Sequence, residues 1–200
     1  MAYLDSNTKY LGIISLMFKY FLRQPRKTGA LCSSSNALAS MMTNNIGLDS
    51  AKYIVEIGPG LGVFTKQIIK HKNPESNFFV LEVNSVIAND LQKKFQNIEI
   101  INENANKLLE IMASKQIENI DVVVSGIPWS IVREKDQNNM LDVIHKSLKE
   151  GGHFSTFAYA LPTIKAKKFR KKLFDRFKHI KMSQMVWLNF PPAYVYYCRK

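Results

Sequence analysis

The 200-residue sequence has few cysteines, few acidic residues and no long apolar run. Its two cysteines, Cys32 and Cys198, lie near opposite ends of the chain. They predict neither a disulfide framework nor a closely spaced pair of metal ligands, so we expect no metal and a reducing, cytoplasmic compartment. The mean hydropathy of -0.15 is far from that of a membrane-spanning protein. This length suits one domain, or a domain with a short appendage.

Acidic residues are outnumbered, 16 against 28 basic ones, which gives a net charge of +12 and a pI near 9.7. Two segments hold the excess: residues 1–30 carry five basic residues against one acidic, and residues 163–181 carry nine against one. The remainder is balanced, with 14 of each sign. A neutral body with two basic segments predicts an anionic partner.

The first basic segment surrounds an apolar run at residues 11–22, which Lys19 interrupts. The run is shorter than the roughly 20 residues of a bilayer span, and its flanking charges argue against a signal peptide. Glycine, serine and basic residues form one narrow helical stripe beside a wide apolar face, as in an interfacial helix. A helix packed on its own domain is the alternative, and the sequence leaves both open.

The second segment, residues 163–181, also repeats apolar residues at helical spacing between its lysines and arginines. Its apolar face can cover a sheet while the charges stay in water. The basic surface that remains suits anionic lipid headgroups and RNA phosphates equally well.

Short β-rich runs alternate with amphipathic stretches along the rest of the chain, which predicts a mostly parallel sheet with helices on both faces. The glycines at 151 and 152 are expected to end a helix, and residues 181–188 and 193–198 predict an antiparallel hairpin at the sheet edge. The expected strands are 52–57, 77–82, 98–102, 121–125 and 153–159, and the expected helices are 62–71, 85–95, 104–113 and 137–149.

The strongest motif is E-x-G-x-G-x-G, formed by Glu56, Gly58, Gly60 and Gly62 between a predicted strand and a predicted helix. Glycine allows a sharp turn and a close approach of the backbone to a ligand. Glu82 follows Gly62 by 20 residues at the end of the next strand, where a carboxylate binds ribose hydroxyls.

These features resemble the class I S-adenosylmethionine-dependent methyltransferases over about residues 50–200. The resemblance implies a Rossmann-like α/β fold with a seven-stranded sheet. It implies that the glycine motif binds the methionine and ribose parts of S-adenosylmethionine, and that Glu82 and the adjacent Val83 hold the ribose. Asn104 and Ala105 stand where the family usually has an adenine-contacting G-D-A motif, and the Asn104 side-chain oxygen can accept the adenine amino proton.

Ser125, Pro128 and Trp129 follow the fourth strand and match the Ser-x-x-Pro-aromatic loop of methyltransferases that act on amines. A polar acceptor there orients the amine, and Ser125 also adjoins the cofactor. An aromatic face, from Trp129 or Tyr159, stabilises the growing positive charge. Alternatively, Ser125 caps a strand end and the aromatic residues fill the core.

Two related families share this pattern: the small-subunit rRNA adenine dimethyltransferases and the short bacterial phospholipid N-methyltransferases. The latter also show P-x-x-T-G-A, V-V-S-G-L-P and N-x-P-P-A-x-V-Y, which resemble residues 25–30, 123–128 and 189–196. The resemblance implies that Lys27, Thr28 and Gly29 form a lid over the cofactor. Departures at Ser33, Asn104 and Trp129 leave the headgroup preference open.

We therefore expect a cytoplasmic enzyme bound peripherally to the inner face of a membrane, which methylates the amine of phosphatidylethanolamine towards phosphatidylcholine. Residues 1–48 would form an amphipathic helix and lid, and residues 49–200 the S-adenosylmethionine-binding domain. Anionic phospholipid would be the partner surface. An rRNA adenine N6-methyltransferase is the alternative, although no dedicated RNA-stacking domain is evident, and a non-catalytic lipid-binding domain is the second alternative.

Overall fold

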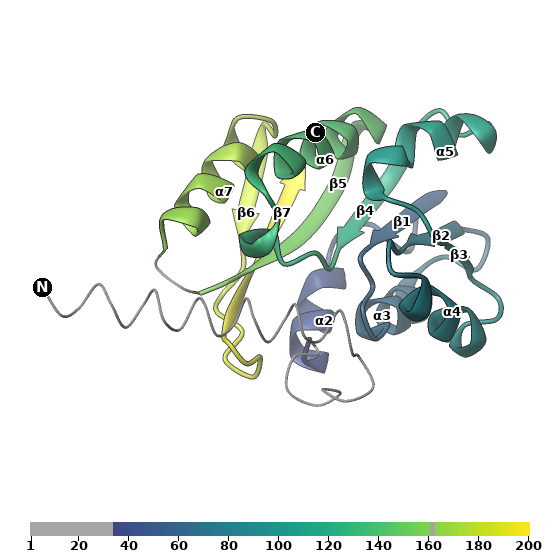
Figure 1. Ribbon diagram of the computed structural model, residues 1–200, viewed down its shortest axis with the longest axis horizontal. Helices are drawn as coiled ribbons and strands as arrows, with labels where there is room; N and C mark the ends of the chain where they lie inside the picture. Colours follow the sequence, from purple (N-terminus) through teal and green to yellow (C-terminus); the bar gives the residue numbers. More distant parts are fainter. Residues whose placement is uncertain (1–33, 161–162) are drawn as a thin grey trace, which may run out of the picture.

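The computed structural model describes residues 34–160 and 163–200. Its centre is a seven-stranded sheet in the order β3-β2-β1-β4-β5-β7-β6 (Figure 1). Strands β1 to β5 pair in parallel, whereas β7 runs antiparallel to both β5 and β6. The predicted fold class is confirmed. The strands are β1 (Tyr53–Ile57), β2 (Asn77–Leu81), β3 (Glu99–Ile101), β4 (Ile120–Ser125), β5 (Leu148–Tyr159), β6 (His179–Met182) and β7 (Ala193–Arg199).

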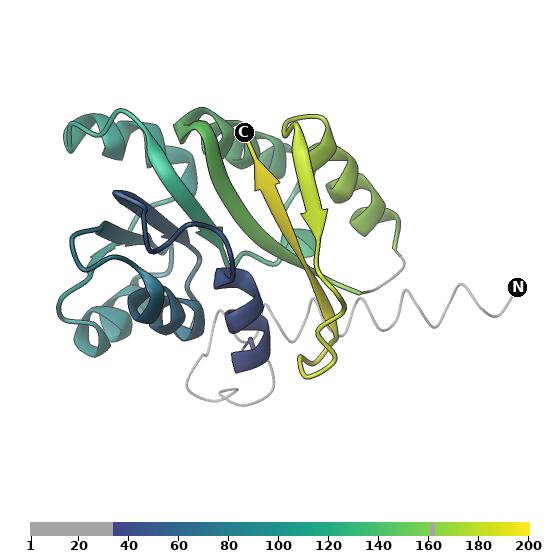
Figure 2. The ribbon, with the colours of Figure 1, turned by 180° about the vertical axis from the view of Figure 1, so that it is seen from behind.

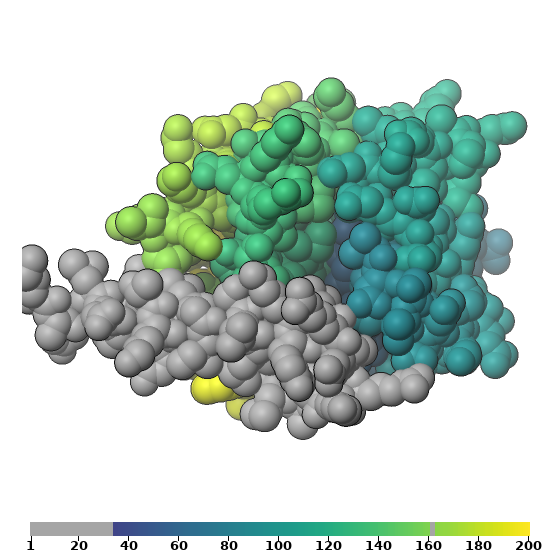
Figure 3. Space-filling model, in the orientation of Figure 1, coloured from purple at the N-terminus to yellow at the C-terminus, as the bar shows by residue number. Residues whose placement is uncertain are grey.

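Helices cover both faces of the sheet, as Figures 1 and 2 show from opposite sides. Side chains alternate along each strand, so Val55 packs into the core on one face and Ile54 into the core on the other. The helices are α2 (Asn36–Thr43), α3 (Val63–His71), α4 (Ser85–Lys94), α5 (Leu108–Ser114), α6 (Glu134–Ser147) and α7 (Ile164–Phe174), with 3₁₀ turns η1 (Ala105–Lys107) and η2 (Trp129–Ile131). Figure 3 shows the face formed by α7, α6 and α5.

Helix α2 lies within the segment expected to be an N-terminal appendage, yet it is part of the domain core. Leu38, Ala39 and Met42 are fully buried in one core with residues of α3 and the sheet. The Ser155 hydroxyl on β5 donates a hydrogen bond to the Met42 carbonyl at 2.7 Å. The predicted N-terminal helix, the lid residues Lys27, Thr28 and Gly29, and Cys32 all lie outside the described residues.

The glycines at 151 and 152 do not end a helix, contrary to prediction. Helix α6 ends at Ser147, and β5 begins at Leu148 and runs through both glycines. The pairing of β4 with β5 shifts register between Ile120 and Val122, and Gly151 has a φ of 74°. A bulge in a strand needs such a residue, so the glycines mark an irregular strand pairing.

The C-terminal hairpin forms, but its first strand is shorter than the predicted 181–188. Strand β6 ends at Met182, and the connection to β7 is a loop in which Ser183 donates to the Val195 carbonyl at 2.9 Å and Val186 forms a bridge with Ala193. Cys198 is buried on β7, where burial raises the pKa of its thiol.

The second basic segment contains the predicted helix, now α7, and its apolar side is part of the core. Phe169 and Leu173 are buried, and Phe169 stacks on Trp129 with ring centres 5.0 Å apart. One of its lysines, Lys172, is also buried and donates to Gln137 Oε1 at 2.9 Å. Within the described ranges, no helix is long and apolar enough to cross a bilayer.

Candidate active site

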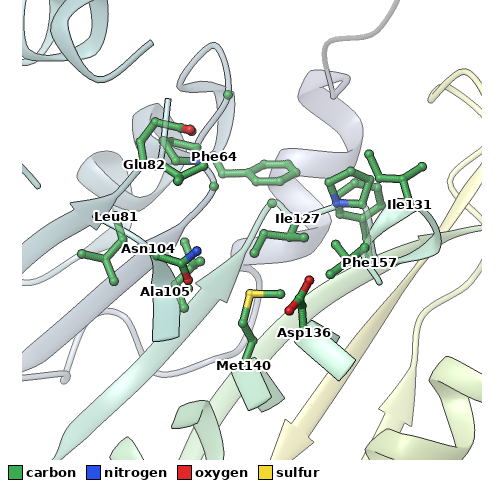
Figure 4. Close-up of a pocket in the computed structure, with 18 of the residues that line it drawn as sticks. Phe64, Leu81, Glu82, Asn104, Ala105, Ile127, Ile131, Asp136, Met140 and Phe157 are labelled. Atoms are coloured by element: carbon green, nitrogen blue, oxygen red, sulfur yellow. The ribbon is translucent and has the colours of Figure 1, made fainter. Parts of the chain in front are cut away.

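A cavity of about 340 Å³ opens at the carboxyl ends of the parallel strands. Ligands of open α/β sheets bind at this edge, because the loops that follow neighbouring strands diverge there. Residues after β1, β2, β3 and β4 line one side, and residues of α6 and β5 line the other (Figure 4). Parts of several motifs singled out from the sequence therefore meet in one place: Gly58 and Gly60, Glu82, Asn104 and Ala105, and Pro128.

The glycine turn between β1 and α3 forms the floor of this cavity. Gly58, Gly60 and Gly62 all have φ between 57° and 78°, a region that residues with a Cβ rarely adopt. Among the described residues, no atom lies within 4 Å of a Cβ built on Gly60, so that Cβ would project into the cavity. A Cβ on Gly62 would instead lie 2.5 Å from the ring of Phe95, which follows the last residue of α4. Gly60 thus exposes the backbone to a ligand, whereas Gly62 packs the domain.

The loop that follows β4 lies back to back with the glycine turn. Gly126 donates to the Ile57 carbonyl at 2.9 Å, and Gly58 donates to the Leu81 carbonyl at 2.9 Å. A Cβ on Gly126 would overlap the Gly58 carbonyl oxygen. The two loops are therefore one packed unit.

Glu82 is 4% exposed and lines the cavity at the end of β2. Its carboxylate accepts from the Asn84 amide at 2.9 Å. Burial raises the pKa of this carboxyl, and the amides of Asn84, Gly60 and Val83 partly oppose the shift. A buried carboxylate in this place can accept both hydroxyls of a ribose.

Glu56 does not line the cavity and lies beneath the glycine turn. It is fully buried, and neither carboxylate oxygen meets a hydrogen-bond partner among the residues that the structure describes. Burial raises the pKa of Glu56 to about 8, although the hydroxyl and amide of Thr65 lie close enough to oppose the shift. The neutral acid therefore predominates at pH 7.

Val83, Asn104 and Ala105 line the cavity beside Glu82. Val83 is 68% exposed, and Ala105 is buried at the start of η1. The Asn104 side-chain oxygen caps η1 by accepting from the Asn106 amide at 2.9 Å. An amide oxygen has a second lone pair, so this cap leaves one acceptor position for an amino group.

Two residues expected at the amine, Ser125 and Trp129, lie behind the lining. The Ser125 hydroxyl accepts from the Ile127 amide at 3.3 Å, and its carbonyl accepts from Thr156. Trp129 is 2% exposed, and its indole N–H donates to the Thr156 hydroxyl at 2.7 Å. Both residues therefore make their contacts within the protein interior. In the case of Trp129, η2 turns the ring towards α7.

Other aromatic residues face the cavity instead. Pro128 and Tyr159, both predicted at the amine, do line it, together with Phe64 and Phe157. The Phe157 ring meets the rings of Phe64 and Tyr159 edge to face, with centres 6.0 Å and 5.4 Å apart. These rings can supply the aromatic surface that the sequence assigned to Trp129.

Two charged residues of the lining, Arg133 and Asp136, were missed by the sequence analysis. Arg133 Nε donates to Asp136 Oδ2 at 2.6 Å at the start of α6. Their spacing of three resembles any exposed helical ion pair, so only the three-dimensional structure reveals that they border a cavity.

S-adenosylmethionine fits the residues at this site. The open backbone at Gly60 leaves room for the methionine part, the buried carboxylate of Glu82 matches a ribose diol, and the apolar slot beside Ala105 suits a purine. No group of three or more His, Cys, Asp or Glu that could hold a metal occurs in the described ranges. This fold and this site together define a class I S-adenosylmethionine-dependent methyltransferase.

Comparison with known proteins identifies the family. Residues 50–187 match the family model described as "Putative methyltransferase", and the chain belongs to this family. The protein is an enzyme that uses S-adenosylmethionine as its cofactor. Its fold is similar to that of an O-methyltransferase from Bacillus cereus in complex with SAH, with a TM-score of 0.67 and 11% identity over 90% of this chain and 89% of that one.

Curated relatives methylate different acceptors. The chain is 28% identical to an ornithine lipid N-methyltransferase from Singulisphaera acidiphila over 90% of its own length and 92% of the relative's. It is 33% identical to a tRNA (guanine-N(7)-)-methyltransferase from Alkaliphilus oremlandii, over only 60% of the chain and 61% of that protein.

Proposed function

We propose that this enzyme methylates the primary amine of a membrane lipid, with phosphatidylethanolamine as the expected acceptor and a membrane surface as the place of reaction. The carrying observation is an exposed apolar loop beside the cavity. Similarity to the ornithine lipid enzyme along nearly the full length of both chains supports the same class of acceptor. Phosphatidylethanolamine and ornithine lipid share a primary amine on a headgroup that also carries an anion.

The apolar loop, residues 183–192, connects β6 to β7. Trp187, Leu188 and Phe190 are 73%, 83% and 80% exposed, which is unusual for three large apolar side chains in one loop. Between them Asn189 is buried, accepts from the Ser35 amide at 2.9 Å and donates to the Pro191 carbonyl at 2.7 Å. The loop is therefore anchored to α2 while its apolar side chains project outwards.

The apolar loop lies at the same edge of the sheet as the cavity. Strand β7 begins at Ala193, which pairs with Tyr159 at the end of β5, and Tyr159 lines the cavity. The Ala160 amide also donates to the Pro192 carbonyl at 2.7 Å. Tryptophan and phenylalanine favour the interface of a bilayer, so insertion of this loop would bring the cavity mouth to the headgroups.

Helix α7 precedes the hairpin and lies beside β6, towards the end of the hairpin away from the apolar loop, where it supplies cationic surface (Figure 1). Its core-facing side is already occupied by protein contacts, so any lipid contact falls to its exposed basic side chains. Each such residue near an anionic membrane contributes about 1 kcal/mol. The exposed basic residues of α7 are Lys165, Lys167, Lys168, Arg170 and Lys171.

Bound S-adenosylmethionine supplies an electrophilic methyl group on a positively charged sulfur. The acceptor nitrogen needs a free lone pair, so the headgroup ammonium first loses a proton, which we assign to solvent water. The chain itself provides position and exclusion of water: Pro128 shapes the loop, and Phe64, Phe157 and Tyr159 enclose the methyl acceptor with aromatic surface.

The test follows radiolabelled methyl groups from S-adenosylmethionine into four acceptors offered in parallel. These are vesicles with phosphatidylethanolamine, vesicles with ornithine lipid, vesicles of phosphatidylcholine and phosphatidylglycerol alone, and total bacterial RNA. We expect label in an amine lipid and none in RNA. Label in RNA alone would overturn the proposal in favour of an RNA methyltransferase.

A loop variant tests the membrane contact separately. Replacing Trp187, Leu188 and Phe190 by serine should lower sedimentation with vesicles at least tenfold and leave the affinity for S-adenosylhomocysteine unchanged. The matched control replaces the exposed Ile69 and Leu109 by serine, on α3 and α5. Equal sedimentation of the loop variant and the control would show that the loop is not the membrane contact.

A further inference from the structure

The cavity holds an ion pair that the reaction described so far does not use. Arg133 and Asp136 line the same cavity as Gly60 and Glu82. Their bond of 2.6 Å joins an Arg133 side chain that is 85% exposed to an Asp136 side chain that is 32% exposed. Figure 4 shows the Asp136 carboxylate pointing into the cavity, beside Met140 and towards Ile127 and Phe157.

The charges around the cavity are distributed unevenly. Glu82 and Glu103 lie after β2 and β3, on the side assigned to ribose and adenine. Asp136 lies across the cavity from Glu82, and the labelled side chains next to it, Met140, Ile127 and Phe157, are apolar or aromatic (Figure 4). Arg133 is the single cation among the described residues of the lining. One carboxylate and one guanidinium therefore stand together on the acceptor side.

An ordinary helical ion pair does not account for this placement. Lys107 and Glu110 form the same i,i+3 pair at the start of α5, at 2.8 Å, but neither lines the cavity. That pair is exposed to water at both ends, with side chains 51% and 69% exposed. Asp136 instead sits among apolar side chains, where a carboxylate gains most from a cationic partner that enters with the ligand.

We propose that Asp136 and Arg133 together bind the zwitterionic headgroup of the acceptor lipid. Asp136 accepts a hydrogen bond from the headgroup amine, and Arg133 binds the anion of the same headgroup. This inference rests on the proposed function and deepens it. The anion is a phosphate diester in phosphatidylethanolamine and a carboxylate in ornithine lipid, and a guanidinium binds either with two parallel hydrogen bonds.

The pair is suited to this exchange because its charges compensate each other before the lipid arrives. Arg133 is long and mostly exposed, so its side chain can turn towards the cavity mouth while Asp136 stays on α6. When the ammonium form of the headgroup binds, each charge of the pair exchanges one opposite charge for another, so no unpaired charge is left among the apolar side chains. Asp136 acts as a positioning residue that holds the nitrogen near the loop at Pro128.

The experiment compares Asp136→Asn and Arg133→Gln with the matched control Glu110→Gln, which removes the acid of the equivalent pair on α5. Initial rates are measured on vesicles containing phosphatidylethanolamine, ornithine lipid, or stearylamine, an amine without an anion. Binding of S-adenosylhomocysteine by calorimetry provides a readout that does not depend on turnover. Circular dichroism reports whether each variant is folded.

We expect Asp136→Asn to raise the KM for both zwitterionic lipids about tenfold, since a neutral amide oxygen accepts a weaker hydrogen bond from the headgroup amine than a carboxylate does. It should also raise the KM for stearylamine. Arg133→Gln should raise the KM for the zwitterionic lipids alone. Glu110→Gln and the affinity of all variants for S-adenosylhomocysteine should stay within twofold of wild type. If Asp136→Asn does not fold, Asp136→Glu and Arg133→Gln carry the test.

Three results would overturn the inference. In the first, Asp136→Asn behaves like Glu110→Gln, so the pair only stabilises a helix end. In the second, Asp136→Asn weakens S-adenosylhomocysteine binding as much as lipid binding, which places the residue at the cofactor. In the third, the wild-type enzyme labels none of the vesicles; this outcome refutes the proposed function itself, whereas the first two leave it standing.

Discussion

The two sides of the cavity are built from different parts of the chain. The cofactor side depends on backbone: the glycine turn and the β4 loop pack against each other, and amides support Glu82. The acceptor side depends on side chains from the β4 loop, α6 and β5, which meet only when these elements pack. Mutations on the cofactor side should therefore change cofactor affinity locally. Mutations on the acceptor side should act by changing how the β4 loop, α6 and β5 pack.

Trp129→Ala gives the largest effect expected on the acceptor side. Loss of the stack on Phe169 and of the hydrogen bond to Thr156 should lower the free energy of unfolding by about 3–5 kcal/mol, as for other buried aromatic residues. Urea denaturation measures this change in the free energy of unfolding. Trp129→Phe retains the ring and should cost about 1 kcal/mol, the value of one hydrogen bond. If Trp129→Ala left the free energy of unfolding unchanged but abolished turnover, Trp129 would instead contact the acceptor amine, as the sequence predicted.

Glu56→Gln tests the buried acid that lies beneath the glycine turn on the cofactor side. The folded-state pKa of about 8 lies above the ordinary 4.5, so folding opposes ionisation and wild-type stability falls as the pH rises from 4.5 through 8. A glutamine does not ionise. Relative to wild type, the variant should gain on the order of 3 kcal/mol between pH 5 and pH 8. Thermal unfolding of both proteins without cofactor measures this difference. If the two curves of stability against pH stay parallel from pH 5 to pH 8, the raised pKa of Glu56 is contradicted.

Gly60→Val should separate binding from folding on the cofactor side. Its side chain would project into the cavity, so we expect the affinity for S-adenosylhomocysteine to fall about 100-fold, equivalent to about 2.7 kcal/mol. The positive φ of Gly60 adds a strain of about 1–3 kcal/mol to the folded state. Gly62→Val is the matched comparison, because its side chain would strike Phe95 and should reduce stability first. Calorimetry and thermal unfolding of both variants measure the difference.

Glu82→Gln should produce the smallest effect, about a tenfold loss of affinity, because an amide oxygen still accepts one hydroxyl. The raised pKa of Glu82 adds a pH dependence with a fixed sign. Acidification protonates the wild-type carboxylate and weakens binding, so the difference between wild type and variant should shrink from pH 8 to pH 5. A difference that grows on acidification would exclude Glu82 as the ribose acceptor.

The sequence predicted the residues that line the side expected to hold the cofactor far better than those on the expected acceptor side, for a physical reason. Gly58, Gly60 and Glu82 act through local backbone shape and through position at strand ends, which spacing reveals. Trp129 and Asp136 depend on the direction that η2 and α6 impose on their side chains, and no spacing rule encodes that direction. Gly151 was misread because a glycine after a helical run predicts a helix end as readily as a bulge.

The close packing of Gly58 against Gly126 has a consequence for redesign of this enzyme. Neither loop tolerates a larger residue at these positions without displacing the other. Substitutions there should therefore abolish cofactor binding before they change the choice of methyl acceptor. The first turn of α6 and the loop before β7 are held by separate contacts. Mutant libraries intended to alter headgroup preference should therefore diversify those two segments and keep Gly58 and Gly126 constant. One unchanged methyl-donor site could then serve many acceptors.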